Sequence, residues 1–199
     1  MYPPKHHQDD NIDHLIKTIQ AFPLATLISA NGEDCFTTHI PLIYSKDNSV
    51  YGKLVGHLDK NNPQCAFLDN RKVYAIFNGP NTYISPNTYT TVQLPTWNYI
   101  NVHVEGISII NNDPDAIKKS MIEMTRFLET SDTPFVLDYD HTRMNQLVNF
   151  VTGIEITITR LEGKFKLSQD KIPADTKNAR EKLILDSQKN LRTFIESII

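Results

Sequence analysis

Side chains suited to binding small molecules gather in five short segments of the sequence. Together these segments supply histidine, asparagine, tyrosine, serine, the single tryptophan and two lysines. A flat ring binds against aromatic or apolar walls, and a phosphate binds lysine, hydroxyl and backbone N–H groups. The mixture therefore predicts a site for a planar aromatic ligand that carries a phosphate, with Tyr83 and Trp97 as candidate walls. The segments are 38–41, 56–63, 83–86, 94–106 and 162–169.

The candidate phosphate-binding residues are Lys164, Lys166 and Ser168, which recur at every second position. In an extended segment this spacing places all three side chains on one face. The intervening Phe165 and Leu167 then point to the opposite face, toward a core. An ordinary solvated strand face has the same pattern, so spacing alone leaves both interpretations open.

Histidine is frequent enough, at seven residues, to raise the question of a metal centre. His39, His57 and His103 fall on different expected strands, but no HxH, HxxxH or HExxH spacing imposes a ligand geometry. Isolated histidines commonly serve as hydrogen-bonding groups instead. We therefore predict no metal site, and we expect His6 and His7 to be exposed near the N-terminus.

Motifs for covalent catalysis and for the common nucleotide-binding loops are absent from the sequence. It contains no GxSxG, no GxGxxG after an expected strand and no GxxxxGK[ST]. Cys35 and Cys65 show no CxxC spacing and no obvious histidine partner. Nucleotide binding must therefore use another arrangement, and no catalytic residue is predicted.

Composition indicates one globular domain in a reducing compartment. The chain has 199 residues, 40% of them hydrophobic, with 20 Lys and Arg against 23 Asp and Glu. A net charge of −3 without a long basic run argues against broad binding to nucleic-acid phosphates. No apolar stretch approaches the roughly 20 residues that span a bilayer, and no signal-peptide core is present. We expect a cytoplasmic protein that does not enter a membrane.

Periodicity in the first half predicts strands with one helix before them. Ile12, Leu15, Ile16 and Ile19 recur at helical spacing over 11–20. Strands are expected at 24–30 and 35–44, joined at Asn31-Gly32, the strongest two-residue hairpin signal. A third strand at 50–57 would complete a meander. A short helix at 62–68 and an apolar strand at 73–77 follow, the latter ended by Asn78-Gly-Pro.

The second half predicts two more strands and three helices. Residues 81–96 lack a period and are expected to form a long loop. Strands follow at 99–110 and from 154 onward, with helices at 113–129 and 140–151 between them. A charged amphipathic helix follows Pro173. No crossover helix separates the first three strands, so we predict an α+β fold built on an antiparallel barrel.

Several strings, taken in order, resemble the signatures of the PaiB family, whose members are described as FMN-binding negative transcriptional regulators. The likeness runs from residue 1 to about 175. It implies an antiparallel split β-barrel of the flavin-reductase and pyridoxamine-phosphate-oxidase type with peripheral helices. It also implies a homodimer with FMN at or near the subunit interface. The strings are Met1-Tyr-Pro-Pro-Lys-His, Thr38-His-Ile-Pro-Leu, Gly56-His, Asn61-Asn-Pro-Gln, Phe77-Asn-Gly-Pro-Asn-Thr-Tyr-Ile-Ser-Pro, Pro95-Thr-Trp-Asn-Tyr, Val102-His-Val-Glu-Gly and Gly163-Lys-Phe-Lys-Leu-Ser-Gln.

The resemblance also implies a set of cofactor-binding positions and a division of the chain. An FMN-binding domain would occupy 1–175 and a C-terminal amphipathic helix 176–199. The chain departs from the family pattern at Asp59 and Asp170, which add carboxylates near the expected phosphate. The implied FMN-binding residues are His39, His57, Asn61, Tyr83, Ser85, Trp97, Asn98, Lys164, Lys166, Ser168 and Gln169.

Three functions are compatible with this sequence. The resemblance implies an FMN-binding repressor with promoter DNA as a partner, although no helix-turn-helix is apparent. An FMN-dependent oxidoreductase acting on a small molecule is the first alternative, because the cofactor would supply the chemistry. A module that binds haem or another flat ligand is the second.

Overall fold

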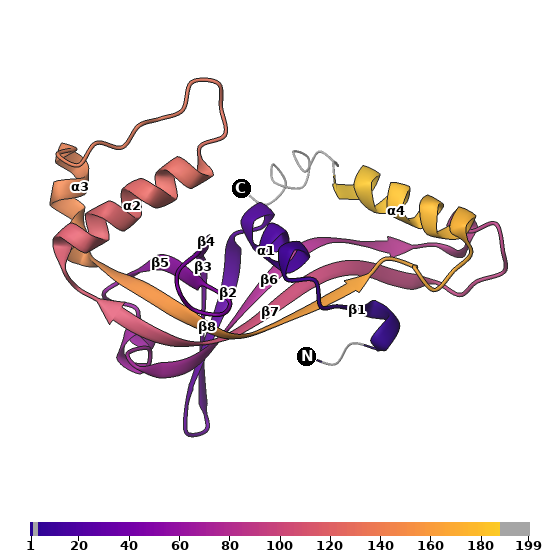
Figure 1. The fold of residues 1–199 in the computed structure, drawn as a ribbon, viewed down its shortest axis with the longest axis horizontal. Coiled ribbons are helices and arrows are strands. Elements are labelled where there is room, and N and C mark those ends of the chain that lie inside the picture. Colours follow the sequence, from indigo (N-terminus) through magenta and orange to yellow (C-terminus); the bar gives the residue numbers. More distant parts are fainter. Residues whose placement is uncertain (2–3, 188–199) are drawn as a thin grey trace, which may run out of the picture.

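The structure is a computed structural model that describes residue 1 and residues 4–187, and a long antiparallel sheet runs through it (Figure 1). The strands are β1 (Gln8–Asp9), β2 (Leu24–Asn31), β3 (Asp34–Pro41), β4 (Ile43–Ser45), β5 (Lys53–Asp59), β6 (Arg71–Ile84), β7 (Thr96–Asn111) and β8 (Val151–Lys166). The α-helices are α1 (Ile12–Ala21), α2 (Pro114–Leu128), α3 (Thr142–Leu147) and α4 (Pro173–Ser187). Within the described residues, no helix is long and apolar enough to cross a membrane.

A barrel forms because the two ends of the sheet are neighbours in the chain. The strand order is β3-β2-β6-β7-β8-β5-β4, with β1 added to β8. Leu42 alone separates β3 from β4, and it is fully buried. The sheet therefore curls until its first and last strands meet. Alternating apolar residues line the interior, as the period-2 pattern predicts. The core includes Leu15, Ile19, Leu27, Leu42, Leu54, Phe77, Val102, Val104, Ile154 and Ile156.

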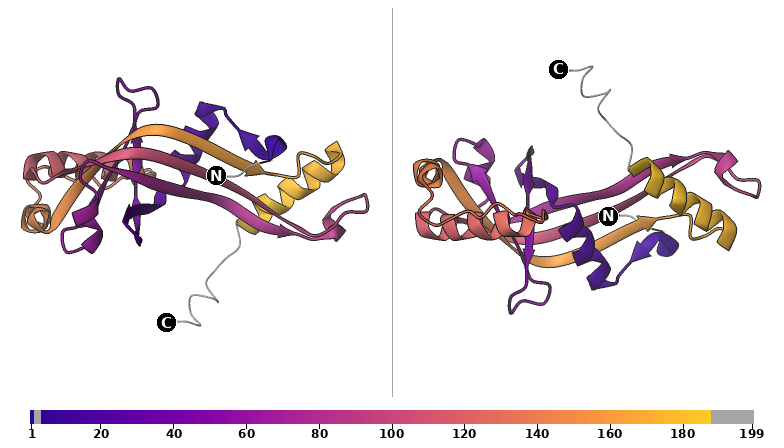
Figure 2. Two further views of the ribbon diagram at one scale, coloured as in Figure 1. Left: turned by 90° about the horizontal axis from the view of Figure 1, so that it is seen from below. Right: turned by 90° about the horizontal axis from the view of Figure 1, so that it is seen from above.

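Three strands are much longer than the barrel requires. β6, β7 and β8 have 14, 16 and 16 residues, and they run from α2 and α3 at one end to α4 at the other (Figures 1 and 2). α4 packs against β6 beyond the barrel, while α2 packs against β5 and β8 at the opposite end. The part of the three strands that α4 covers is called the extension here. One of its faces meets α4, and the other faces outward.

A bulge in β8 changes which side chains face outward along the extension. Glu105 pairs with Arg160, whereas the next residue of β7, Gly106, pairs with Ile158. Thr159 is therefore the extra, unpaired residue of a β-bulge. Before the bulge the even-numbered Ile154, Ile156 and Ile158 face the core. After it the outward positions are the even-numbered ones, which include Lys164 and Lys166.

The sheet differs from the expected pattern in two places. Residues 35–44 do not form one strand, because Pro41 and Leu42 divide it into β3 and β4. The expected meander is therefore wrong: β5 pairs with β4 and β8 instead of β3. β6 also continues past Asn78-Gly79-Pro80 to Ile84 through a register shift against β7. Hydrogen bonding to β7 keeps the chain extended beyond Pro80, although Asn78-Gly79-Pro80 is typical of the end of a strand.

The helices agree more closely with the expected ranges. Asn11 caps α1 by accepting a hydrogen bond from the Asp13 backbone N–H. The helix expected at 140–151 ends at 147, and Val151 begins β8. α4 begins at Pro173, a little before the predicted boundary at 176, and buries Ala179 and Leu183. Four further residues expected to pack lie outside the described residues: Leu191, Phe194, Ile195 and Ile198.

Closure of the barrel makes a testable demand on Gly56. A Cβ atom there would lie 2.6 Å from Leu42 Cδ2 and 2.8 Å from the Pro41 carbonyl oxygen. We expect Gly56→Ala to lower the free energy of unfolding by about 1–3 kcal/mol, because overpacking forces the backbone to move. Urea denaturation measures this loss.

Gly32 provides the matched control in the β2–β3 turn. Its φ is +62°, and nothing lies within 4 Å of a Cβ built there. Asparagine tolerates this backbone region, so Gly32→Asn should leave stability nearly unchanged. Equal stability of the two variants would contradict the proposed role of Gly56 in closure.

Candidate functional site

The outward face of the extension carries exposed aromatic side chains. Tyr83 of β6 lies opposite Trp97 of β7, and their ring centroids are 6.4 Å apart. Each of the two residues is about half exposed. Trp97 Nε1 donates a hydrogen bond to Asn81 Oδ1 at 3.2 Å, and Asn81 lies opposite Tyr99. Asn81, Tyr83, Trp97 and Tyr99 are called the aromatic platform.

Two lysines border the aromatic platform on the same face. Lys166 lies opposite Tyr99 in the β7–β8 register. Lys166 Nζ donates a hydrogen bond to Thr96 Oγ1 at 2.6 Å, and Lys164 Nζ lies 5.4 Å from the centre of the Tyr99 ring. The structure therefore brings together four of the predicted residues: Tyr83, Trp97, Lys164 and Lys166.

A polar pocket of about 320 Å³ opens beside Lys166, where β8 ends. His7, one of its lining residues, is only 7% exposed, and its Nδ1 has no hydrogen-bond partner in the described part of the chain. A buried polar atom without a partner costs free energy that a bound polar group can recover. The polar pocket is lined by His7, Gln93, Leu94, Pro95, Thr96, Lys166, Ser168, Asp170 and Lys171.

Burial and nearby positive charges disfavour the protonated form of the His7 ring. Burial lowers the pKa of His7 most, and His6, Lys166 and Lys164 lower it further, while Asp170 raises it. The expected exposure of His7 is therefore wrong: the N-terminal segment folds over the end of β8 through the pairing of β1. A neutral imidazole offers one donor and one acceptor nitrogen.

Ser168 does not continue the lysine face. β8 ends at Lys166, and Ser168 has a φ of +56°, which turns the chain. Its hydroxyl lies 2.9 Å from the Tyr89 hydroxyl and 3.0 Å from Asn98 Nδ2, all in a buried group. The expected extended segment through Ser168 is therefore wrong. Ser168 and Asn98 hold the turn and the neighbouring loop together behind the aromatic platform.

Ser85 and Gln169, also among the implied cofactor-binding residues, stabilise turns. Ser85 Oγ accepts a hydrogen bond from the Asn87 backbone N–H at 3.3 Å. Gln169 Oε1 accepts one from the Leu167 backbone N–H at 2.7 Å, and its Nε2 donates to the Phe165 carbonyl oxygen at 2.5 Å. Neither side chain lines the polar pocket.

The remaining three predicted residues lie at the barrel end of the chain. His39 is exposed on β3, His57 is half-buried on β5, and Asn61 is exposed in the turn after β5. His57 pairs with Gly153, thirteen residues before Lys166 along β8. At about 3.3 Å per residue this separation is roughly 40 Å. One chain therefore does not bring His57 or Asn61 to the aromatic platform. His39 lies in a row of paired residues that ends at Glu162, four strands away or roughly 20 Å.

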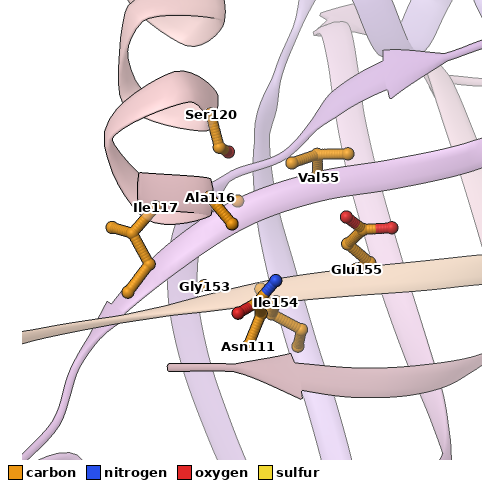
Figure 3. Close-up of a pocket in the computed structure, with 9 residues that line it drawn as sticks. Val55, Asn111, Ala116, Ile117, Ser120, Gly153, Ile154 and Glu155 are labelled. Atoms are coloured by element: carbon orange, nitrogen blue, oxygen red, sulfur yellow. The ribbon is translucent and has the colours of Figure 1, made fainter. Parts of the chain in front are cut away.

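A hollow beneath α2 is too small to serve as a cofactor site. Ser120 of α2 projects toward β5 and β8, with Asn111 and Glu155 nearby (Figure 3). The volume of this hollow is about 30 Å³, which is enough for about one water molecule. The neighbouring His57 Nε2 and Ser120 Oγ have no partner among the described residues. Burial lowers the pKa of His57. A hydrogen bond with the Ile117 backbone raises this pKa, but by less than burial lowers it.

The three histidines considered for a metal centre stay apart. His39, Thr26, Ile76 and His103 form a row across four strands. At about 4.8 Å per strand, His39 and His103 are roughly 14 Å apart, and His57 lies beneath α2. Among the described residues, no group of three His, Cys, Asp or Glu side chains could hold a metal ion.

Asp175 fixes the loop that lines the polar pocket, and the sequence analysis did not single it out. This carboxylate, in the first turn of α4, is fully buried. It accepts hydrogen bonds from the Thr90 backbone N–H at 2.5 Å, from Thr90 Oγ1 at 2.8 Å and from the Thr91 hydroxyl. A sequence signal did exist, since Pro173 followed by Asp175 is typical of a helix start. Its loop partners become visible only in three dimensions.

Comparison with known proteins identifies the family. Residues 1–160 match the family described as "Putative FMN-binding domain". The protein belongs to this family. It is also 26% identical to protease synthase and sporulation protein PAI 2 of Bacillus subtilis (strain 168), over 98% of this chain and 95% of the relative. The FMN-binding domain family therefore accounts for nearly all of the signatures noted in the sequence, and the resemblance is confirmed.

Solved structures place this FMN-binding-domain protein among split barrels. The conserved hypothetical protein Rv2991 from Mycobacterium tuberculosis superposes with a TM-score of 0.60 and 13% identity, covering 86% of this chain and 94% of that one. The FAD and heme binding protein from Mycobacterium smegmatis gives 0.54 and 13%, covering 80% and 73%. At these identities the likeness shows the fold alone, and the α+β split-barrel prediction is confirmed.

Acid should test the anchor that Asp175 provides. Burial raises the pKa of Asp175, but hydrogen bonds from Thr91 and Thr90 outweigh burial and hold the pKa below its usual value. Such a carboxylate stabilises the fold above its unfolded-state pKa of about 3.9 and loses that contribution as pH falls through its folded-state pKa. We expect stability to fall less steeply between about pH 5 and pH 3 in Asp175→Asn than in the wild type.

Urea midpoints measured across this pH range provide the readout. Asp34→Asn, at the exposed start of β3, is the matched control and should keep the wild-type slope. An unchanged slope in Asp175→Asn would show that the carboxylate does not anchor the loop.

Proposed function

We propose that this protein binds FMN on the aromatic platform, with its phosphate end toward Lys164 and Lys166. The supporting observation is the combination of two exposed rings, Tyr83 and Trp97, with two lysines on one sheet face. Flat ring systems bind against aromatic faces, and a phosphate favours lysines. When bound, FMN would supply redox chemistry, and the chain would supply orientation and charge.

We further propose that the complete site forms between two copies of this chain. His57 lies roughly 40 Å from Lys166 within one chain, a distance greater than the length of FMN, and Asn61 lies beyond it in the turn after β5. In a two-fold dimer each contact between the copies occurs twice, with the roles of the two copies exchanged. Each copy therefore contributes residues to both sites. The barrel end of one copy would then face the aromatic platform of the other.

The biological role that we propose is that of a PaiB-type negative transcriptional regulator. The match to PAI 2 over nearly the full chain supports this role. An FMN-dependent oxidoreductase and a haem-binding module are the competing outcomes. Retarded migration of promoter DNA at low salt would favour the regulator. Oxidation of NAD(P)H by the flavin-loaded protein would favour the enzyme, and a Soret band after haem addition would favour the haem-binding module.

Trp97 provides the direct test of the aromatic platform. Aromatic stacking contributes about 1–3 kcal/mol per ring in comparable sites, so Trp97→Ala should weaken FMN binding by roughly 10-fold or more. Quenching of FMN fluorescence during titration measures this. Trp97→Phe keeps an aromatic face and should retain most of the affinity. Equal affinity in all three proteins would remove the platform from the site.

Complementation tests the two-copy site. Asn61→Ala and Trp97→Ala should each weaken FMN binding by roughly 10-fold or more, so that neither variant binds at an FMN concentration that saturates the wild type. In a mixture of the two variants, random exchange of subunits makes about half of the dimers mixed, and each mixed dimer has one intact site. About a quarter of the wild-type binding capacity should therefore return. No recovery, together with a monomeric mass in sedimentation, would contradict a shared site.

A further inference from the structure

The polar pocket is lined by two basic residues, His7 and Lys171, that are not among the predicted FMN-binding residues. Its walls come from the N-terminal 3₁₀ helix Lys5–His7, from the loop before β7 and from the turn after β8. His7 contributes a buried ring with an unpartnered Nδ1, and Lys171 contributes a second ammonium beside Lys166. These groups line one pocket together with Lys166, which lies opposite Tyr99 of the aromatic platform.

We propose that the polar pocket binds the terminal phosphomonoester of the ligand, and that His7 and Lys171 determine selectivity for the phosphorylated flavin over riboflavin. The inference rests on the proposed flavin function and deepens it. It assigns the phosphate to His7, Lys166 and Lys171. The Ser168 hydroxyl also lines the pocket but is already hydrogen-bonded to Tyr89 and Asn98. The ring system then remains on the aromatic platform.

Charge in the pocket favours a doubly charged ligand. Lys166 and Lys171 provide two positive charges, and Asp170 provides one negative charge. Asp170 is already paired with Lys171 at 2.8 Å, so an entering anion competes for the Lys171 ammonium. The net charge is +1 while His7 is neutral. A phosphomonoester carries between about −1.5 and −2 at pH 7, which complements this surface better than a neutral hydroxyl does.

Binding of a phosphate should also draw a proton onto His7. Without ligand, burial, His6, Lys164 and Lys166 all disfavour the charged ring, and only Asp170 favours it. A dianion beside His7 adds a favourable interaction with the charged form, which raises its pKa. FMN binding should therefore strengthen as pH falls from about 8 to 6.5, above the second pKa of the phosphate itself, about 6. Riboflavin lacks the dianion and should show no such trend.

The experiment compares FMN with riboflavin in four proteins: the wild type, His7→Asn, Lys171→Met and the control Lys177→Met. Lys177 is exposed on α4 and does not line the polar pocket. We expect His7→Asn and Lys171→Met each to weaken FMN binding by roughly 10-fold, as loss of a charge-assisted hydrogen bond does. Riboflavin binding should stay unchanged, which also shows that the variants are folded. His7→Asn should in addition remove the pH dependence.

Inorganic phosphate separates failure of this inference from failure of the proposed function. Phosphate should shift the His7 ring resonances in an NMR titration of the wild type and compete with FMN, but it should not compete with riboflavin. If FMN and riboflavin bind equally and the His7 variant changes neither, the inference is wrong while flavin binding stands. If neither flavin binds, the proposed function fails, and a phosphate-induced shift of His7 alone would still support an anion pocket.

Discussion

The hydrogen-bonded ladder of β6, β7 and β8 is the constraint on which the rest of the molecule depends. Inside the barrel these strands bury Phe77, Val102 and Ile156, which fixes their register through hydrophobic packing. Beyond the barrel the same ladder continues without an enclosing wall. Its two faces therefore have separate roles: one meets α4, and the other presents the aromatic platform.

Charge pairs reinforce this ladder on its outward face. Glu105 pairs with Lys72 at 2.6 Å and with Arg160 at 3.1 Å, joining β6, β7 and β8 across the barrel section. Exposed pairs of this kind each contribute little, but they give Glu105 of β7 a partner on each neighbouring strand. On the opposite face, the Asp175 carboxylate and the Ser168 group hold α4 and the loop of the polar pocket together. Rigid support behind a binding surface reduces the entropy lost on binding.

Local sequence signals predicted the parts of this fold that depend on neighbours in the chain. Asn31-Gly32 marked the β2–β3 turn, and Asp113 with Pro114 marked the start of α2. Pairing between distant strands was beyond such signals: Gly79-Pro80 reads as a stop, yet pairing with β7 carries β6 through it. The opposition of Tyr83 and Trp97 and the burial of His7 likewise depend on strand register, which spacing within one segment does not contain.

The extra residue at Thr159 determines on which side of the sheet the lysines emerge. Side chains alternate strictly along a strand, so a single unpaired residue exchanges inside and outside for everything that follows it. The apolar residues of β8 follow this exchange. Before the bulge they are the even-numbered Ile154, Ile156 and Ile158, and after it they are the odd-numbered Leu161 and Phe165. Without the inserted residue, Lys164 and Lys166 would lie on the covered face of the sheet, where α1 packs against β8, and Phe165 would face solvent. One bulge residue, several positions before the lysines, thus determines that their ammonium groups lie on the same face as the aromatic platform.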